Sequence, residues 1–167
     1  VEYLISLGHK RILFMGGSFD AFHTQEKIDE YRTTLSANGI EVSDELIVEG
    51  DFESYSAYTA LKRKIATGVK FTAIYCISTQ MCVGCYRALN EDGYRIPEDV
   101  SVINYGDPYF TEFLNPALTT VHLPLEELGR SLTAKMMGFI EKGKKQITGE
   151  VFMPNKLNVR NSTSSIR

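Results

Sequence analysis

One segment, from Gly93 to Ile103, constrains the fold of this chain more than any other part of the sequence. Gly93 accepts the left-handed conformation that closes a helix, because a glycine has no Cβ to clash there. Pro97 has no backbone N–H and prevents the helix from restarting. Val100, Val102 and Ile103 form a short β-branched run that is typical of buried strands in parallel sheets. The segment therefore predicts an amphipathic helix, a fixed turn and an inner strand of a parallel sheet.

Short apolar strands and amphipathic helices alternate through the first 116 residues. We expect strands over residues 11–15, 46–48, 72–77 and 100–104. The intervening helices are expected over residues 1–7, 24–38, 54–67 and 80–92. Such alternation predicts an α/β fold with a parallel sheet and helices on both faces, because parallel strands need crossover connections. Ligands of these sheets bind at the carboxyl ends of the strands. The segments of interest are therefore residues 16–22, 50–52, 78–80 and 105–108.

The pattern changes after Pro116. Residues 118–123 are typical of an extended linker, residues 125–141 of an amphipathic helix, and residues 142–146 of a basic turn. Residues 151–159 have the character of edge strands, where the interruption by Pro154 is tolerated.

Composition restricts the class of protein. The 167 residues are 43% apolar, which is enough for the packed core of one domain or slightly more. No apolar run is long enough to predict a membrane span, and the net charge of −3 lacks the basic excess of most nucleic-acid-binding domains. The three cysteines, Cys76, Cys82 and Cys85, have no second Cys or His pair at zinc-ligand spacing. We therefore expect free thiols in a reducing cytoplasm, no metal and no cofactor.

Four short motifs appear in one register along the chain, and together they resemble the lactose/galactose-repressor (LacI/GalR) family of bacterial regulators. They span Ser6–Ile12, Gly93–Ile103, Asn115–Val121 and Arg160–Thr163. The resemblance implies a fold like that of the type I periplasmic binding proteins, in which an effector binds between two lobes behind a helix-turn-helix head. It assigns residues 1–116 and 147–167 to the C-terminal, effector-binding and dimerisation lobe. It assigns residues 117–146 to a crossover and a helix of the N-terminal lobe.

The first residues, Val1–Ile5, have the pattern of a helix already under way, so we expect a fragment that lacks the head and most of the first lobe. Operator DNA would then be contacted only through that absent head. The resemblance thus implies a non-enzymatic, cytoplasmic module that senses a small polar effector such as a sugar.

The resemblance also assigns an effector site, in which several positions depart from the family pattern. Gln25 stands where the family often has an arginine, and Ser78 begins the segment where it has an Asn-Asp pair. Gly106 precedes Asp107 where the family has two aspartates, whereas Phe52 matches the aromatic residue that stacks on the ligand. These departures fit either a different effector or a site that has lost small-molecule binding. The expected effector-binding positions are Phe19, Phe22, Gln25, Phe52, Ser78, Tyr105, Gly106 and Asp107.

The resemblance further implies a homodimer formed through the C-terminal lobe. The aromatic loop from Tyr109 to Leu114 suits an interface, although it could instead pack on its own sheet. The apolar face of residues 125–140 lacks most of its expected lobe, so we expect it to contact a neighbouring copy, to swap or to be poorly ordered. The expected interface residues are Tyr55, Tyr58, Cys82, Tyr86, Leu89, Tyr109, Phe110, Phe113 and Leu114.

A competing interpretation concerns Met15–His23, which is similar to the opening of nucleotidylyltransferases. Their glycine-rich turn presents a His-x-Gly-His pair to the phosphates of a nucleotide. Here Thr24, Gln25 and Glu26 follow His23, so the glycine and the second histidine are missing, and no catalytic residues are assigned. A periplasmic-type sugar-binding protein is a third alternative, which an upstream signal peptide would distinguish from a regulator with an upstream helix-turn-helix.

Overall fold

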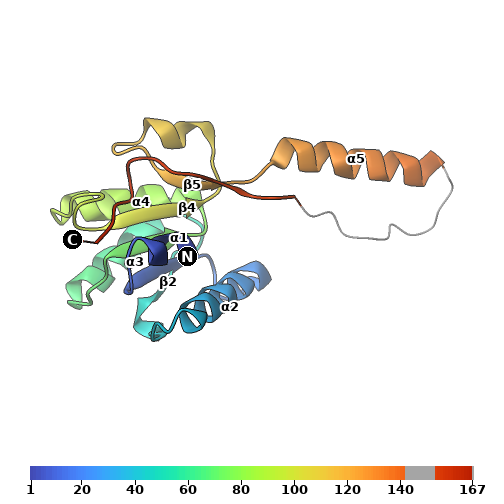
Figure 1. The fold of residues 1–167 in the computed structure, drawn as a ribbon. Coiled ribbons are helices and arrows are strands. Elements are labelled where there is room, and N and C mark those ends of the chain that lie inside the picture. The colour runs from blue at the N-terminus through green and yellow to red at the C-terminus, as the bar shows by residue number, and fades with distance from the viewer. Residues whose placement is uncertain (142–152, 167) are drawn as a thin grey trace.

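The computed structural model describes residues 1–141 and 153–166 and shows a mixed α/β fold built on a single sheet (Figure 1). The six strands lie in the order β2-β1-β3-β4-β5-β6. All neighbouring pairs from β2 to β5 are parallel, and β6 is antiparallel to β5. The expected parallel sheet is therefore confirmed. The strands are β1 Ile12–Gly16, β2 Ile47–Glu49, β3 Ala73–Cys76, β4 Ser101–Tyr105, β5 Thr119–His122 and β6 Lys156–Asn158.

Helices cover both faces of this sheet. On one face, Tyr31 of α2 packs on Phe14 of β1 with ring centroids 5.3 Å apart, and its hydroxyl donates to the carbonyl of Ile12 at 2.7 Å. On the other face α4 lies over β3, where the sulfurs of Cys76 and Cys85 are 3.9 Å apart, and α3 packs on α4. The helices are α1 Glu2–Ser6, α2 Phe22–Ala37, α3 Ser54–Ala66, α4 Thr79–Glu91 and α5 Leu125–Glu141, with short 3-10 turns η1 Asp44–Leu46 and η2 Tyr109–Phe113.

The turn between α4 and β4 has the structure that its sequence predicts. Gly93 has φ = 76°, and the next residue, Tyr94, donates its backbone N–H to the carbonyl of Leu89 at 2.9 Å. The carboxylate of Asp99 accepts the backbone N–H of Arg95 at 2.8 Å and also binds its guanidinium. These contacts fix the path by which the chain enters the buried strand β4.

The sheet continues beyond the boundary expected at residue 117. Thr119 pairs with Ile103 in the parallel ladder of β4 and β5. The hydroxyl of Ser162 accepts the Thr119 N–H at 2.8 Å and donates to the Val102 carbonyl at 2.6 Å. Residues 119–122 therefore belong to the same layer as β4. The edge strand expected after Pro154 is present as β6; the expected basic turn at 142–146 and residues 147–152 lie outside the described residues.

Helix α5 stands away from the body of the molecule (Figure 1). None of its residues is buried, and the side chains of Leu125 and Ile140 are each 66% exposed. The amphipathic helix expected over residues 125–141 is thus present. Within the described residues, no helix is both long and apolar enough to cross a membrane.

Gly84→Ala should destabilise the chain, because an alanine Cβ would lie 2.0 Å from the backbone oxygen of Ser54 and would push α4 away from α3. Overpacking of this kind costs about 1–3 kcal/mol in the free energy of unfolding, which urea denaturation measures. The control, Gly129→Ala in α5, places its Cβ where no atom lies within 4 Å and should be neutral or stabilising. Equal stability of the two variants would contradict the close α3–α4 contact.

Candidate functional site

The residues predicted to bind an effector gather at one edge of the sheet. The strands β1 to β4 run parallel, so the loops that follow them meet at their common carboxyl edge, where α2, α3 and α4 begin. The loops after β1, β2, β3 and β4 carry Phe19, Phe52, Ser78 and Asp107, respectively. Topology therefore brings together residues that lie as much as 88 positions apart (107 − 19) in the sequence.

Phe52 is held across the turn that joins β1 to α2. Its ring stacks on the ring of His23 with centroids 5.0 Å apart, and it lies so close to Gly17 that a Cβ there would be 1.9 Å from the ring. Both Asp51 and Phe52 have positive φ, at 51° and 58°. Such angles are uncommon for residues with side chains and are frequent at functional loops. Sequence reasoning missed this role of His23, because no local pattern pairs it with Phe52.

Gln25 braces the same turn. Its side-chain amide donates to the carbonyl of Phe19 at 2.6 Å, and the Phe19 N–H donates to a carboxylate oxygen of Glu49 at 2.7 Å. Glu49 is therefore a second residue of the site that the sequence did not reveal. Phe22 lies in the first turn of α2 with 77% of its surface exposed. The turn presents apolar rings to solvent on a backbone fixed by two hydrogen bonds.

The end of β4 explains one departure from the family pattern. Gly106 has φ = 108°, a conformation that would strain any residue with a Cβ. The buried amide of Asn104 donates to the Gly106 carbonyl at 2.8 Å and to the Thr79 hydroxyl at 2.7 Å. Tyr105 is half-buried beneath the ammonium of Lys27, which lies 4.9 Å from its ring centroid. The backbone here accommodates glycine rather than an aspartate.

The carboxylate of Asp107 is surrounded by donors of its own chain. One oxygen accepts from the Thr111 hydroxyl at 2.8 Å and from Arg160 Nη1 at 2.9 Å. The other accepts from the Asn158 amide at 2.7 Å, and Nδ1 of His122 lies 3.6 Å away. The Asp107 side chain is 9% exposed. Burial alone would raise the pKa of Asp107, but the hydrogen bonds from Arg160, Thr111 and Asn158 outweigh it and hold this pKa well below its usual value.

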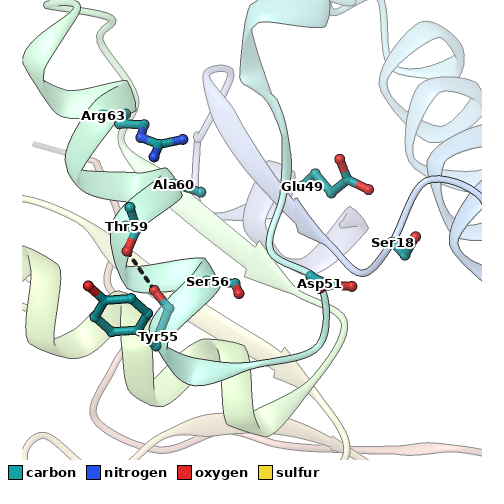
Figure 2. Close-up of a pocket in the computed structure, with 8 residues that line it drawn as sticks. All are labelled: Ser18, Glu49, Asp51, Tyr55, Ser56, Thr59, Ala60 and Arg63. Carbon is teal, nitrogen blue, oxygen red and sulfur yellow. Dashed lines mark hydrogen bonds between the residues drawn. The ribbon is translucent and has the colours of Figure 1, made fainter.

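A hollow of about 500 Å³ opens beside the predicted site, between the end of β2 and one side of α3 (Figure 2). Figure 2 shows Glu49 and Ser18 on one side of it and Arg63 on the other, with the Thr59 hydroxyl bound to the Tyr55 carbonyl at 2.8 Å. None of the eight predicted effector-binding residues lines this hollow, so the two features adjoin but do not coincide. Its lining residues are Ser18, Glu49, Asp51, Tyr55, Ser56, Thr59, Ala60 and Arg63.

The residues predicted to form a dimer interface divide into two groups. Tyr55, Tyr109 and Phe113 are 76%, 81% and 75% exposed, and Tyr58, Phe110 and Leu114 are half-buried. By contrast, Cys82, Tyr86 and Leu89 are buried within their own chain. The prediction that these three side chains contact a second copy is therefore corrected: α4 packs against β3, β4 and the neighbouring helix α3, and this face of α4 points inward. Exposed Tyr109 and Phe113 show that their loop does not pack fully on its own sheet.

All three cysteines are free and buried. Burial raises the pKa of the Cys76 thiol well above its usual value, which keeps it protonated and unreactive. In the part of the chain that the structure describes, no three His, Cys, Asp or Glu side chains are grouped so that they could hold a metal ion.

Comparison with known proteins extends these observations. A sequence profile described as "Periplasmic binding protein-like domain" matches residues 1–163. The "HTH-type transcriptional repressor PurR" of Vibrio atlanticus (strain LGP32) is 36% identical over 130 residues, which make up 78% of this chain and 39% of that protein. The chain thus spans less than half the length of this curated relative.

Two solved structures of regulators have the same fold. The structure titled "transcriptional regulator CelR-cellobiose complex" superposes with a TM-score of 0.86 and 30% identity, covering 96% of this chain and 49% of that one. The "Dimeric Lac Repressor with an 11-residue C-terminal Deletion" superposes with a TM-score of 0.89 and 25% identity, covering 99% of this chain and 59% of that one. This chain therefore spans only about half to three fifths of these two solved chains.

Asp107 should make the free energy of unfolding depend on pH under acidic conditions. Its pKa is depressed in the folded chain and is about 3.9 in an unfolded one. The stabilisation is therefore complete above the unfolded pKa and is lost as the pH falls through the folded one. Urea denaturation from about pH 5 to pH 2 should show a steeper loss of stability for the native chain than for Asp107→Asn.

Asp20→Asn, which changes an exposed carboxylate in the turn after β1, serves as the control and should follow the native curve. A native-like slope for Asp107→Asn would contradict the importance of this carboxylate for stability.

Proposed function

We propose a function for this chain from one premise: it belongs to the LacI/GalR family of transcriptional regulators, whose periplasmic-binding-protein-like domain it carries over residues 1–163. On this premise it is the effector-sensing and dimerisation module of a bacterial DNA-binding regulator. The observation that carries the proposal is the match along almost the full chain combined with the gathering of aromatic and polar residues at the carboxyl edge.

The effector in this proposal is a small polar metabolite such as a sugar. Phe52, Phe19 and Phe22 would offer apolar faces, and aromatic faces suit the flat apolar sides of sugar rings. A polar rim of Gln25, Ser78, Tyr105, Gly106 and Asp107 would supply hydrogen bonds. The relative solved with cellobiose supports this class of ligand. Gln25 in place of an arginine and Gly106 in place of an aspartate make the site less charged, which favours a neutral ligand over an ionic one.

The proposed mechanism is a shift between open and closed arrangements of two lobes. An effector that binds the closed arrangement more tightly shifts the population toward it. We assign α5 to the second lobe, because this helix has an apolar face and no buried residue. The change would reach operator DNA through a helix-turn-helix head outside this chain, and the protein would act in the cytoplasm, where that DNA is.

We propose that the chain has no enzymatic activity. In the turn that resembles nucleotidylyltransferases, the His23 ring stacks on Phe52. The exposed Glu26 stands at the position of the second histidine of those enzymes. A carboxylate at this place repels a triphosphate. The repressor relative, which carries an HTH description in its name, favours a regulator over a periplasmic sugar-binding protein.

We also propose a homodimer that buries the exposed aromatic side chains of η2 and α3. Tyr109 and Phe113 project from η2, and Tyr55 stacks near Tyr58 on α3 with centroids 6.2 Å apart. Large exposed aromatic side chains are typical of protein interfaces. The dimeric lac repressor among the relatives supports this assembly.

Calorimetric titration of the full-length protein with neutral mono- and disaccharides, cellobiose among them, should find one that binds saturably. Phe52→Ala should then weaken binding about tenfold or more, since truncation of an aromatic anchor typically costs about 2 kcal/mol. Tyr94→Ala, an aromatic change at the opposite edge of the sheet, should leave the affinity unchanged. Native affinity in Phe52→Ala would refute the site, and failure of every sugar to bind would refute the ligand class.

Light scattering of this chain at micromolar concentration should give the mass of a dimer. Phe113→Asp should convert it to a monomer, because a carboxylate would be buried without a partner at the interface. Ile166→Asp, which alters an exposed apolar residue near the chain end, should leave the dimer intact. A monomeric native chain would sink the dimer proposal.

A further inference from the structure

We propose that Arg160 is a positioning residue that fastens both crossover strands, β5 and β6, to Asp107 at the effector edge. The Asp107 clamp is the group formed by Asp107, Arg160, Asn158 and Thr120. Through it, the strands β5 and β6 would move together with the loop after β4, and the chain would bend outside the clamp. This inference rests on the proposed function only for its consequence, since the clamp itself is a feature of the fold.

One guanidinium joins three segments of the chain. Nη1 of Arg160 donates to an Asp107 carboxylate oxygen at 2.9 Å, to the Leu118 carbonyl at 2.7 Å and to the Thr120 hydroxyl at 2.9 Å. The backbone N–H of Arg160 also donates to the Thr119 hydroxyl at 3.0 Å. Nη2 also donates to the other Asp107 oxygen at 3.3 Å, so the guanidinium grips both carboxylate oxygens from two nitrogens, which the single ammonium nitrogen of a lysine cannot do. Arg160 therefore ties the segment after β6 to β5 and to the loop after β4.

Asn158 adds a second connection from β6. Its amide donates to Asp107 at 2.7 Å, while its backbone pairs with Thr120 in the β5–β6 ladder. The ladder joins three residues of each strand, from Thr120↔Asn158 to His122↔Lys156. So short a pair at a sheet edge is weakly held by its backbone alone. The side-chain contacts to Asp107 thus supply much of what keeps β6 in place.

The Asp107 clamp is buried enough for the attraction between its charges to be only weakly screened by solvent. The Asp107 and Arg160 side chains are 9% and 20% exposed. In such surroundings an ion pair is screened less than one on the surface, and removal of one partner leaves the other charge poorly solvated. His122, whose side chain is 46% exposed, also lies beside the pair, with its Nδ1 3.6 Å from Asp107.

The chain changes character immediately outside the clamp. Leu123 and Pro124 leave β5 without strand pairing and lead into α5, and residues 153–155 approach β6 in the same way. Figure 1 shows α5 standing away from the sheet beyond this point. The paired strands therefore end at His122 and Lys156, and on the β5 side the bend lies at Leu123 and Pro124. An effector that displaces Asp107 would act on both crossover strands at once.

Hydrogen–deuterium exchange of this chain at neutral pH, without any effector, tests the clamp separately from the proposed function. Arg160→Met and Asp107→Asn should each speed exchange of the amides in residues 119–122 and 156–160 by about tenfold or more, given the usual cost of breaking a sheltered ion pair. Exchange in β1 and β3 should remain within about twofold of the native rate, because a local opening of β5 and β6 does not expose the amides of β1 and β3. The double variant should be no faster than either single one, because the two residues act as a unit.

Two further variants keep the outcome decisive. Arg160→Lys retains the positive charge but not the bridge, so its crossover strands should still exchange faster; native exchange in this variant would overturn the bridging role. Arg32→Met breaks the exposed pair with Asp44 and should leave exchange in both crossover strands unchanged. Unchanged exchange in Asp107→Asn, or an equal increase throughout the sheet, would refute the clamp. Should Arg160→Met fail to fold, Arg160→Lys and Asp107→Asn give the answer.

Discussion

Two parallel strands can be joined only by a connection that crosses back over the sheet, and the strands β2, β1, β3 and β4 are all parallel. From this constraint follow the positions of α2, α3 and α4, which must cover the faces and must each begin at the carboxyl edge. The loops that follow the four strands therefore meet at this carboxyl edge. The candidate site is thus a product of strand direction, and the aromatic and polar residues in those loops determine only what the site can bind.

The motifs by which this chain resembles its family contribute mainly to holding the fold together and not to the proposed ligand contacts. His9, in the turn before β1, is buried and binds the Thr72 hydroxyl at 2.9 Å and the Ser164 carbonyl at 3.0 Å. Ser162 joins β4 to β5, and Arg160 joins β5 to the loop after β4. These residues lie near opposite ends of the sequence, yet their contacts join parts of the same sheet. Such positions tolerate little change, because a buried polar group that loses its partner is costly.

Several residues that face a ligand in the proposed function depart from the family pattern. Gln25 satisfies its amide by binding the Phe19 carbonyl, and Gly106 adopts a backbone conformation that an aspartate would find strained. The resemblance of Met15–His23 to a nucleotide-binding turn also has a structural explanation in this chain. A glycine-rich turn after a first strand is needed here because the Phe52 ring lies against Gly17.

The sequence by itself determined the elements and their order, because apolar periodicity, the glycine cap at Gly93 and the proline after it act within a few residues. It also led to the prediction of an effector site at the carboxyl edge, because ligands of parallel sheets bind outside the carboxyl ends of the strands. Only the tertiary structure decided that β5 joins the sheet, that Leu89 and Cys82 face inward, and that Asp107 binds Arg160, 53 positions away. Contacts between residues so distant in the chain depend on how whole helices and strands pack together, and a local sequence pattern does not contain that information.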